Sequence, residues 1–273
     1  IIEACLAHKL PSEIYGDLEA FLDQVRYPLA VRSSSLLEDS QFQPFAGVYA
    51  TYMLANNHPD LKVRLDQLCD AIKLVYASTY TRAAKSYVDA TANRIEEEKM
   101  AVIVQQVVGR RHDHYDYPHF SGVGLSANYY PAGDLKPEDG VVTVALGLGR
   151  TVVGGGNALR FCPARPLALP QFGTLNDWLR ESQREFFAVD VSRPEQYPGP
   201  RDDFNLALLD LATAEEHGTL APVGSVHVPA ENMIYDGLDR EGDRLVSFAG
   251  VLKAKTFPLA EIMTLLLDLG RRT

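Results

Sequence analysis

An arginine followed by a run of serines is the first set of side chains that could do chemistry. Arg32 carries a rigid fork of N–H donors, and the serines that begin with Ser33 and Ser34 add hydroxyl and backbone N–H groups. Arginine is suited to bidentate contact with phosphate. The segment therefore predicts a polar loop after a strand end that wraps phosphate oxygens. A serine-rich loop that caps a helix beginning near Leu36 fits the same residues, and local sequence leaves both interpretations open.

A second candidate is the glycine-rich segment 147–156, GLGRTVVGGG, which follows an apolar strand. Its spacing matches neither of the two standard nucleotide-binding fingerprints. No Asp or Glu occurs between residues 141 and 176, whereas Arg150, Arg160 and Arg165 do. In an acidic chain this is a locally electropositive stretch, and it predicts a ligand that bears phosphate. A glycine-rich hairpin between two strands is the competing interpretation.

A third candidate is the histidine-rich stretch 110–120, RRHDHYDYPHF. Its His112, Asp113, His114 and Asp116 side chains have the chemistry of metal ligands. The neighbouring Pro, Tyr and Arg residues are typical of a solvated hairpin tip, which we favour over a metal site.

Composition excludes several classes of protein. The 273 residues include 26 Lys and Arg against 36 Asp and Glu, so the formal net charge is 26 − 36 = −10. Such a chain is a poor candidate for coating nucleic acid, which requires a basic surface. No apolar run approaches the ~18 residues of a membrane helix. Cys5, Cys69 and Cys162 form no metal or disulfide pattern, so we expect them to pack as small apolar residues in a cytoplasmic protein.

Several elements must position these candidates. Apolar periodicity predicts a helix over 13–26 and a long helix over 59–90 with a possible break near Ser78. Short strands are expected at 29–31 and 48–54, and the almost wholly apolar 100–108 predicts a buried central strand. Further strands are expected at 120–128, 141–146, 158–162, 185–191, 204–209, 224–228 and 244–249, with helices at 176–184, 211–217 and 260–269. The fold class is therefore α+β, helix-rich over 1–95 and sheet-rich over 96–273.

Five motifs in order carry a resemblance to a known family. They are VRSSSLLED with FAG (31–39 and 45–47), STYTRAAKSY (78–87), MAVIVQQVV (100–108), SGVGLSAN (121–128) and GLGRTVVG (147–154). Together they resemble the nucleotide-binding domain of the phosphoenolpyruvate synthase and pyruvate phosphate dikinase family. Residues 170–273 carry no motif of this kind.

The resemblance implies an ATP-grasp fold, with 1–95 as a helix-rich subdomain and 96–273 as a truncated sheet-rich one. It implies that Arg32 contacts ATP phosphates as a catalytic group, supported by Arg82. A further implied set of ATP-binding residues is Ser33, Ser34, Gly47, Thr51, Gln105, Gln106, Val107, Gly147 and Gly149. Within this set, 105–107 is implied to be the strand edge that hydrogen-bonds adenine. Phosphoryl transfer depends on positioning, positive charge and metal, so Mg²⁺ is also expected.

In the family, ATP phosphorylates a histidine on a separate domain, and pyruvate is then converted to phosphoenolpyruvate. The phosphohistidine and pyruvate-binding domains are thus the implied partners. The expected metal-binding carboxylates and phosphohistidine motif do not occur here, so we expect an ATP-binding piece that is inactive alone. Arg150 replaces a family glutamate, and this charge reversal favours the alternative of a regulatory module that has lost phosphotransfer activity.

Overall fold

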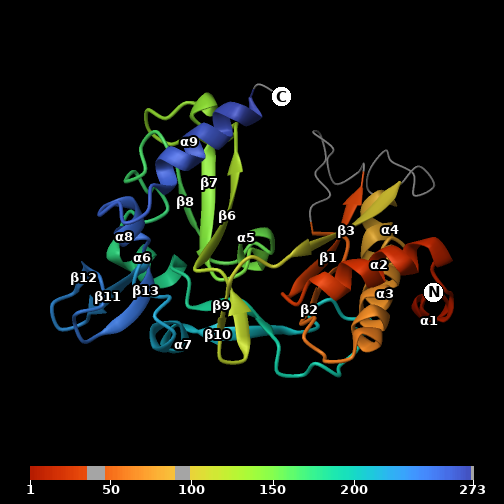
Figure 1. Ribbon diagram of the computed structural model, residues 1–273. Coiled ribbons are helices and arrows are strands. Elements are labelled where there is room, and N and C mark those ends of the chain that lie inside the picture. The colour runs from red at the N-terminus through yellow and green to blue at the C-terminus, as the bar shows by residue number, and fades with distance from the viewer. Residues whose placement is uncertain (36–46, 90–98, 272–273) are drawn as a thin grey trace. The chain divides into compact units, whose positions relative to one another are not determined.

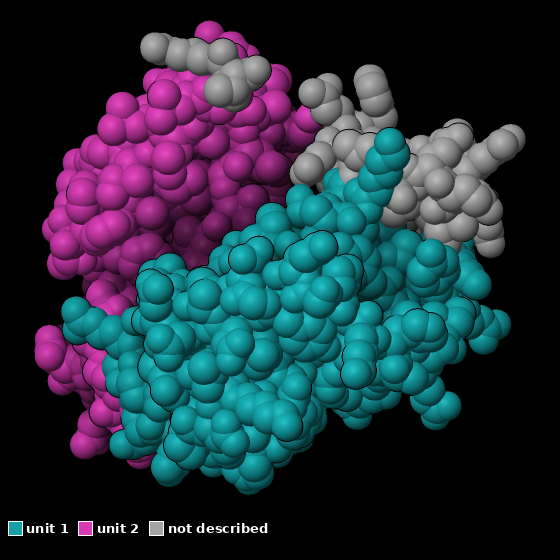
Figure 2. All heavy atoms as spheres, turned by 45° about the vertical axis from the view of Figure 1, so that its right-hand side comes forward, with its two compact units in different colours: residues 1–117, 189–207 teal, residues 118–188, 208–273 magenta. Residues whose placement is uncertain are grey.

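The structure, a computed structural model, describes residues 1–35, 47–89 and 99–271. The described chain forms two compact units, coloured separately in Figure 2. Unit 1 comprises residues 1–117 and 189–207, and unit 2 comprises 118–188 and 208–273. The α+β class expected from the sequence is confirmed, because both units combine helices with small sheets. Among the described residues, no helix has the length and apolar character needed to cross a membrane.

Unit 1 is built on a three-stranded antiparallel sheet with the strand order β2–β1–β3 (Figure 1). Its elements are α1 (Ile2–Ala7), α2 (Ser12–Gln24), β1 (Leu29–Ser35), β2 (Thr51–Leu54), α3 (Leu61–Ser78), α4 (Arg82–Asp89), β3 (Met100–Gln106), β4 (Arg110–His112) and β5 (Tyr115–Tyr117). One sheet face, with Leu29, Val31 and Tyr52, packs in the same apolar core as α3. The residues on the other face of the sheet do not belong to this core.

The long predicted helix is two helices. Asp60 caps α3 through a hydrogen bond from Lys62 N to its carboxylate at 2.8 Å. At the other end the Ser78 hydroxyl donates to Val75 O at 2.6 Å, and α3 ends at Ser78. The expected break near Ser78 is thus confirmed, and α4 begins at Arg82.

The prediction that 100–108 is a buried central strand is wrong. β3 is the edge strand of its sheet, and its side chains alternate between half-buried and exposed. Val102 and Val104 pack against the core, whereas Ala101 and Ile103 are exposed. The apolar run does not mean burial on both faces, because only alternate side chains of this strand meet the core.

Arg64 of α3 is the largest side chain in the interior of unit 1, with 1% of its surface exposed. Its guanidinium donates to Leu22 O at 2.8 Å and to Asn56 Oδ1 at 3.1 Å. Asn56 in turn donates to Val25 O and Tyr27 O, while its own backbone is left-handed with φ of 51°. Burial lowers the pKa of Arg64. This polar network fixes the end of α2 to the start of α3.

Unit 2 contains two further three-stranded sheets, β6–β7–β8 and β12–β11–β13. Their elements are β6 (Phe120–Leu125), the 3-10 turn η2 (Pro137–Asp139), β7 (Val141–Leu146), α5 (Arg150–Val153), β8 (Leu159–Phe161), α6 (Leu175–Glu181), α7 (Leu211–Glu216), β11 (Gly224–Val228), β12 (Met233–Asp236), β13 (Asp243–Val246), α8 (Ala249–Leu252) and α9 (Leu259–Gly270). Helix α9 packs against β6, where a side chain at Gly124 would meet Met263 Cε at 2.5 Å.

Two strands, β9 (Glu185–Asp190) and β10 (Leu206–Asp210), carry the chain from one unit to the other. The units do not divide at residue 95, because β3 pairs with β1 along its whole length and so belongs to unit 1. The assignment of 1–95 and 96–273 as ATP-grasp subdomains stays a prediction.

Candidate functional site

The exposed face of the β2–β1–β3 sheet gathers the polar side chains that the sequence singled out. Arg32 lies opposite both Thr51 of β2 and Ile103 of β3. One row along, Ala30 lies opposite Met53 and Gln105. Directly paired residues project to the same side of a sheet, so Arg32, Thr51 and Gln105 share a face, which we call the open face. Arg32 and Gln105 are exposed, and Thr51 is half-buried.

A hydrogen bond from Nε orients the guanidinium of Arg32. Its Nε donates to the carbonyl oxygen of Ser33 at 3.2 Å. That bond uses one of the five N–H donors of a guanidinium. An arginine oriented in this way on an exposed strand can present its planar fork to an anion with less loss of side-chain freedom on binding.

The serine run lies within β1, because the strand continues to Ser35. The expectation that Arg32 leaves a strand end and that the serines form a loop is therefore wrong for residues 33–35. Alternation places Ser34 on the open face and Ser33, which is 2% exposed, on the core face. The proposed helix cap near Leu36, and the matching Phe45 and Ala46, fall outside the described residues.

The predicted adenine-binding segment 105–107 has a definite backbone orientation. Val107 N donates to Pro28 O at 2.8 Å, so its N–H points toward β1. Backbone groups alternate in direction along a strand, and the N–H and C=O of Gln106 therefore point to the outer edge of β3. No strand pairs with that edge among the described residues of this sheet. Of the three residues, Gln106 offers its backbone groups at this outer edge. Gln105 offers its side chain to the open face.

Two further predicted residues lie near the ends of elements in unit 1. Gly47 is exposed, has φ of +81° and precedes β2. A left-handed conformation of this kind favours glycine. Arg82 is exposed at the start of α4. No hydrogen bond or ion pair joins Arg82 to the open face within the described ranges.

Gly147 and Gly149 lie in unit 2, in the loop between β7 and α5. Gly147 has φ of +79°, and a Cβ there would lie 2.7 Å from both Phe186 Cδ2 and Phe187 O. Its carbonyl accepts the Ser121 hydroxyl at 2.7 Å, and the next N–H, of Leu148, donates to Phe187 O at 2.9 Å. Close packing thus explains this glycine locally, and its phosphate role stays a prediction.

Arg150, which the resemblance aligns with a family glutamate, begins α5 directly after this loop. Its guanidinium carbon lies 5.9 Å from the centre of the Phe187 ring. This is the geometry of a cation–π contact. The positive charge is therefore held beside an aromatic side chain of its own unit.

The histidine-rich stretch forms the hairpin β4–β5, in which His112 pairs with Tyr115. The hairpin interpretation is confirmed. Within the described ranges, no three His, Cys, Asp or Glu side chains are grouped to hold a metal ion. Cys69 and Cys162 are buried as expected, and Cys5 is half-buried.

Comparisons with known proteins identify the class. The family model described as "Pyruvate phosphate dikinase, AMP/ATP-binding domain" matches residues 1–160. The uncharacterized phosphotransferase YvkC of Bacillus subtilis (strain 168) is 27% identical over 155 residues, which is 57% of this chain and 16% of that protein. The phosphoenolpyruvate synthase of Aeropyrum pernix is 30% identical over 128 residues, 46% of this chain and 13% of that protein.

These matches define the class as a nucleotide-binding domain related to phosphotransferases. The chain belongs to the pyruvate phosphate dikinase AMP/ATP-binding domain family. The resemblance drawn from the five motifs is confirmed. The chain aligns with only a small part of the length of these two relatives.

Proposed function

We propose that this chain binds ATP at the open face of the β2–β1–β3 sheet and is the ATP-binding part of a phosphoenolpyruvate synthase-like phosphotransferase. The observation that carries the proposal is the shared face of Arg32, Thr51 and Gln105 within the residues matched by the family. The guanidinium supplies a bidentate phosphate contact, the Thr51 hydroxyl a second donor, and the Gln105 amide a contact to another part of the nucleotide.

The remaining predicted ligands extend this arrangement. Ser34 lies on the open face, and Gln106 offers backbone groups to the adenine at the outer edge of β3. The predicted ATP contacts also include Gly47, Arg82, Gly147 and Gly149, within a predicted ATP-grasp fold.

Mg²⁺ is the expected metal, since it commonly binds to substrate phosphates through one or two carboxylates and water. Arg32, Thr51 and Gln105 supply no carboxylate, so the described open face does not by itself fit a magnesium site. The carboxylate ligands would have to come from elsewhere in the full protein. Arg32 acts by holding and neutralising the phosphates, which is the main requirement of phosphoryl transfer.

The phosphoryl acceptor in this proposal is a histidine on a separate domain, with pyruvate as the final substrate, and the chain alone is inactive. A cytoplasmic location is part of the same proposal, supported by three cysteines that form no disulfide. The alternative is a nucleotide-binding regulatory module without phosphotransfer. Arg150 favours it, because a cation held at Phe187 replaces the family glutamate.

Calorimetric titration of Mg·ATP tests the binding proposal. It compares the present chain, a longer chain with flanking residues, and Arg32→Ala in each. Arg201→Ala is the matched control, because Arg201 is an exposed arginine of unit 1 that pairs locally with Asp203. We expect the longer chain to bind, Arg32→Ala to weaken binding at least about tenfold, and the control to bind normally. Absence of binding in both folded wild-type chains would contradict the proposal.

An ADP-forming or AMP-forming assay on the longer chain then separates the enzyme from the regulatory module.

A further inference from the structure

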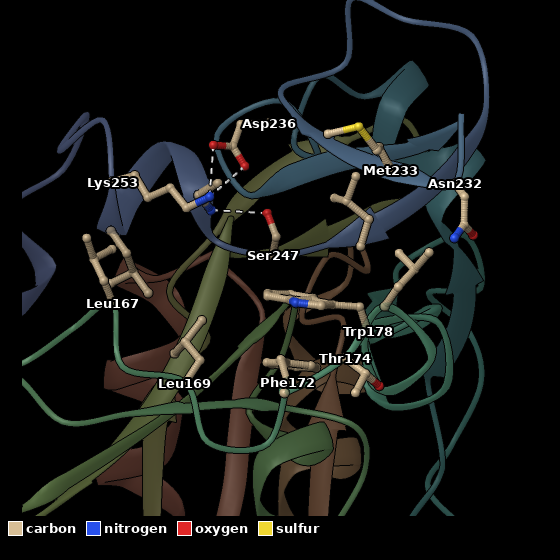
Figure 3. A pocket seen from close by; sticks show the side chains of 15 residues that line it. Leu167, Leu169, Phe172, Thr174, Trp178, Asn232, Met233, Asp236, Ser247 and Lys253 are labelled. Carbon is tan, nitrogen blue, oxygen red and sulfur yellow. Dashed lines mark hydrogen bonds and ion pairs between the residues drawn. The ribbon is translucent and has the colours of Figure 1, made fainter. Parts of the chain in front are cut away.

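Unit 2 contains a cavity of about 390 Å³ that lies entirely outside residues 1–160 (Figure 3). Its walls come from the segment that leads into α6, from β12, and from β13's C-terminal end with α8. This volume lies at the lower end of the range of about 300–1,000 Å³ found for small-molecule sites. The cavity is therefore large enough for a compact ligand.

The floor of the cavity is aromatic. Phe172 and Trp178 stack with ring centroids 3.8 Å apart and planes 10° from parallel. Figure 3 shows the indole of Trp178 with Phe172 on one side and Ser247 on the other. The capping box of α6 holds this helix in place, since Thr174 accepts from Asp177 N and donates to its carboxylate. A flat ligand could continue the stack on the indole.

The opposite wall carries one donor and one acceptor side by side. Lys253 Nζ lies 3.0 and 3.1 Å from the two carboxylate oxygens of Asp236, and both side chains are half exposed. The Ser247 hydroxyl, which also lines the cavity, is hydrogen-bonded with Ser225 Oγ at 2.5 Å and accepts from Ala249 N at 3.2 Å. Lys253 and Asp236 are the charged residues of the lining, and their charges cancel. The remaining lining is mostly apolar.

We propose that this cavity binds a small, uncharged, planar heteroaromatic molecule of about the size of a nucleobase. The ring stacks on Trp178, and an edge with adjacent donor and acceptor atoms pairs with Asp236 and Lys253. A balanced ion pair gives no net attraction to an anion or a cation, and the aromatic floor favours a flat ring over a bulky aliphatic group. The lining of this cavity shares no residue with the proposed ATP site.

Trp178 makes the test direct, because it is the only tryptophan in the chain. Its fluorescence, excited at wavelengths where tyrosine does not absorb, reports this cavity alone. The probes are adenine and nicotinamide as planar heteroaromatics and cyclohexanol as a non-planar neutral molecule of similar size. Asp236→Asn and Lys253→Met test the polar wall. Lys255→Met is the control, since Lys255 pairs with Glu261 outside this cavity.

We expect saturable quenching by at least one planar probe and none by cyclohexanol. Asp236→Asn or Lys253→Met should weaken that binding at least about tenfold, while Lys255→Met and Arg32→Ala leave it unchanged. The wild-type titration needs no variant to fold. Failure of both planar probes to bind, or equal binding of cyclohexanol, would overturn the proposal. Loss of ATP binding in Arg32→Ala with normal adenine quenching shows that the two sites are independent.

Discussion

Arg32 and Thr51 lie directly opposite each other on antiparallel β1 and β2, with both side chains on the open face of the sheet. Opposed residues in such a pair have Cβ atoms about 4.5–5.5 Å apart, so one phosphate group can contact both. The relationship depends on register, because a shift of one residue would turn Arg32 toward α3 and the core.

The first prediction concerns the coupling between these two residues. Arg32→Ala should weaken Mg·ATP binding at least about tenfold and Thr51→Val about three- to tenfold. If both side chains contact the same phosphates, as proposed, the double variant should lose less than the sum of the two free-energy changes. Calorimetry on the four proteins of the cycle measures this coupling. Strictly additive losses would mean that the two side chains do not share a ligand. Thr264→Val is the control and should leave binding unchanged, because the Thr264 hydroxyl donates to Ala260 O within α9.

The second prediction tests why Gly147 is a glycine. Gly147→Ala places a methyl group 2.7 Å from Phe186 and from the Phe187 carbonyl, in addition to the left-handed backbone. We expect a loss of about 3 kcal/mol or more in the free energy of unfolding. Gly155→Ala is the matched control, since its φ is +71° and no atom lies within 4 Å. It should lose only about 1–2 kcal/mol in urea denaturation. Equal losses would show that packing on Phe186 is unimportant.

The third prediction concerns the buried network of Asn56 and Arg64. Asn56→Gly keeps the left-handed backbone accessible but removes the amide that bonds Val25 O, Tyr27 O and Arg64. We expect a loss of about 2–4 kcal/mol in unfolding free energy. Asn56→Ala should lose about 1 kcal/mol more, because alanine disfavours this φ.

Asn232→Gly provides the comparison for that experiment. Asn232 is an exposed asparagine with φ of 53°, and its replacement should change the unfolding free energy by less than about 0.5 kcal/mol. If Asn56→Gly were as mild as this control, the network would contribute nothing to stability.

The fourth prediction is a pH dependence from Glu215 and Arg244. The guanidinium of Arg244 makes two hydrogen bonds of 2.7 Å to the carboxylate, which lower the pKa of Glu215 below its ordinary value of 4.5. A lowered pKa in the folded state stabilises the protein above about pH 4.5, and this stabilisation disappears as the pH falls through the folded value. Because Glu215 is 37% exposed, we expect less than about 1 kcal/mol.

Urea denaturation of wild type and Glu215→Gln measures this contribution. The wild type should be more stable at about pH 7, and the difference should shrink toward about pH 3. Arg244→Lys keeps the charge but loses the two-pronged geometry, so it should fall between the two proteins at neutral pH. A difference that is constant with pH would contradict an ionic origin.

Local periodicity predicted much of the fold because the relevant signals are contained in short segments. The helix expected at 13–26 is α2, and the strands expected at 141–146 and 224–228 are β7 and β11 with the same bounds. Within β2, Thr51 and Met53 share one side of the strand, and Tyr52 and Leu54 are buried on the other. The apolar run at 100–108 predicted a buried central strand and was wrong, because composition does not distinguish a central strand from an edge strand that is covered on one face.

Residue identity and spacing were enough to indicate the family, since the five ordered motifs within residues 31–154 depend on nothing else. The chemistry of the Arg32 fork also predicts an anion-binding side chain, which stays a prediction. The neighbours of Arg32, in contrast, follow from the pairing of the strands. The register of β1 with β2 and β3 places Thr51 and Gln105 on the face of Arg32 and turns Ser33 into the core.

The cavity around Trp178 likewise forms only when distant segments of the chain pack together. Phe172 and Trp178 lie far along the chain from Asp236, Ser247 and Lys253, and no local pattern links them. Their meeting depends on how α6, β12 and α8 pack, and packing is a sum of many weak long-range contacts. Local sequence fixes the chemistry of each side chain, whereas only the folded chain fixes its neighbours.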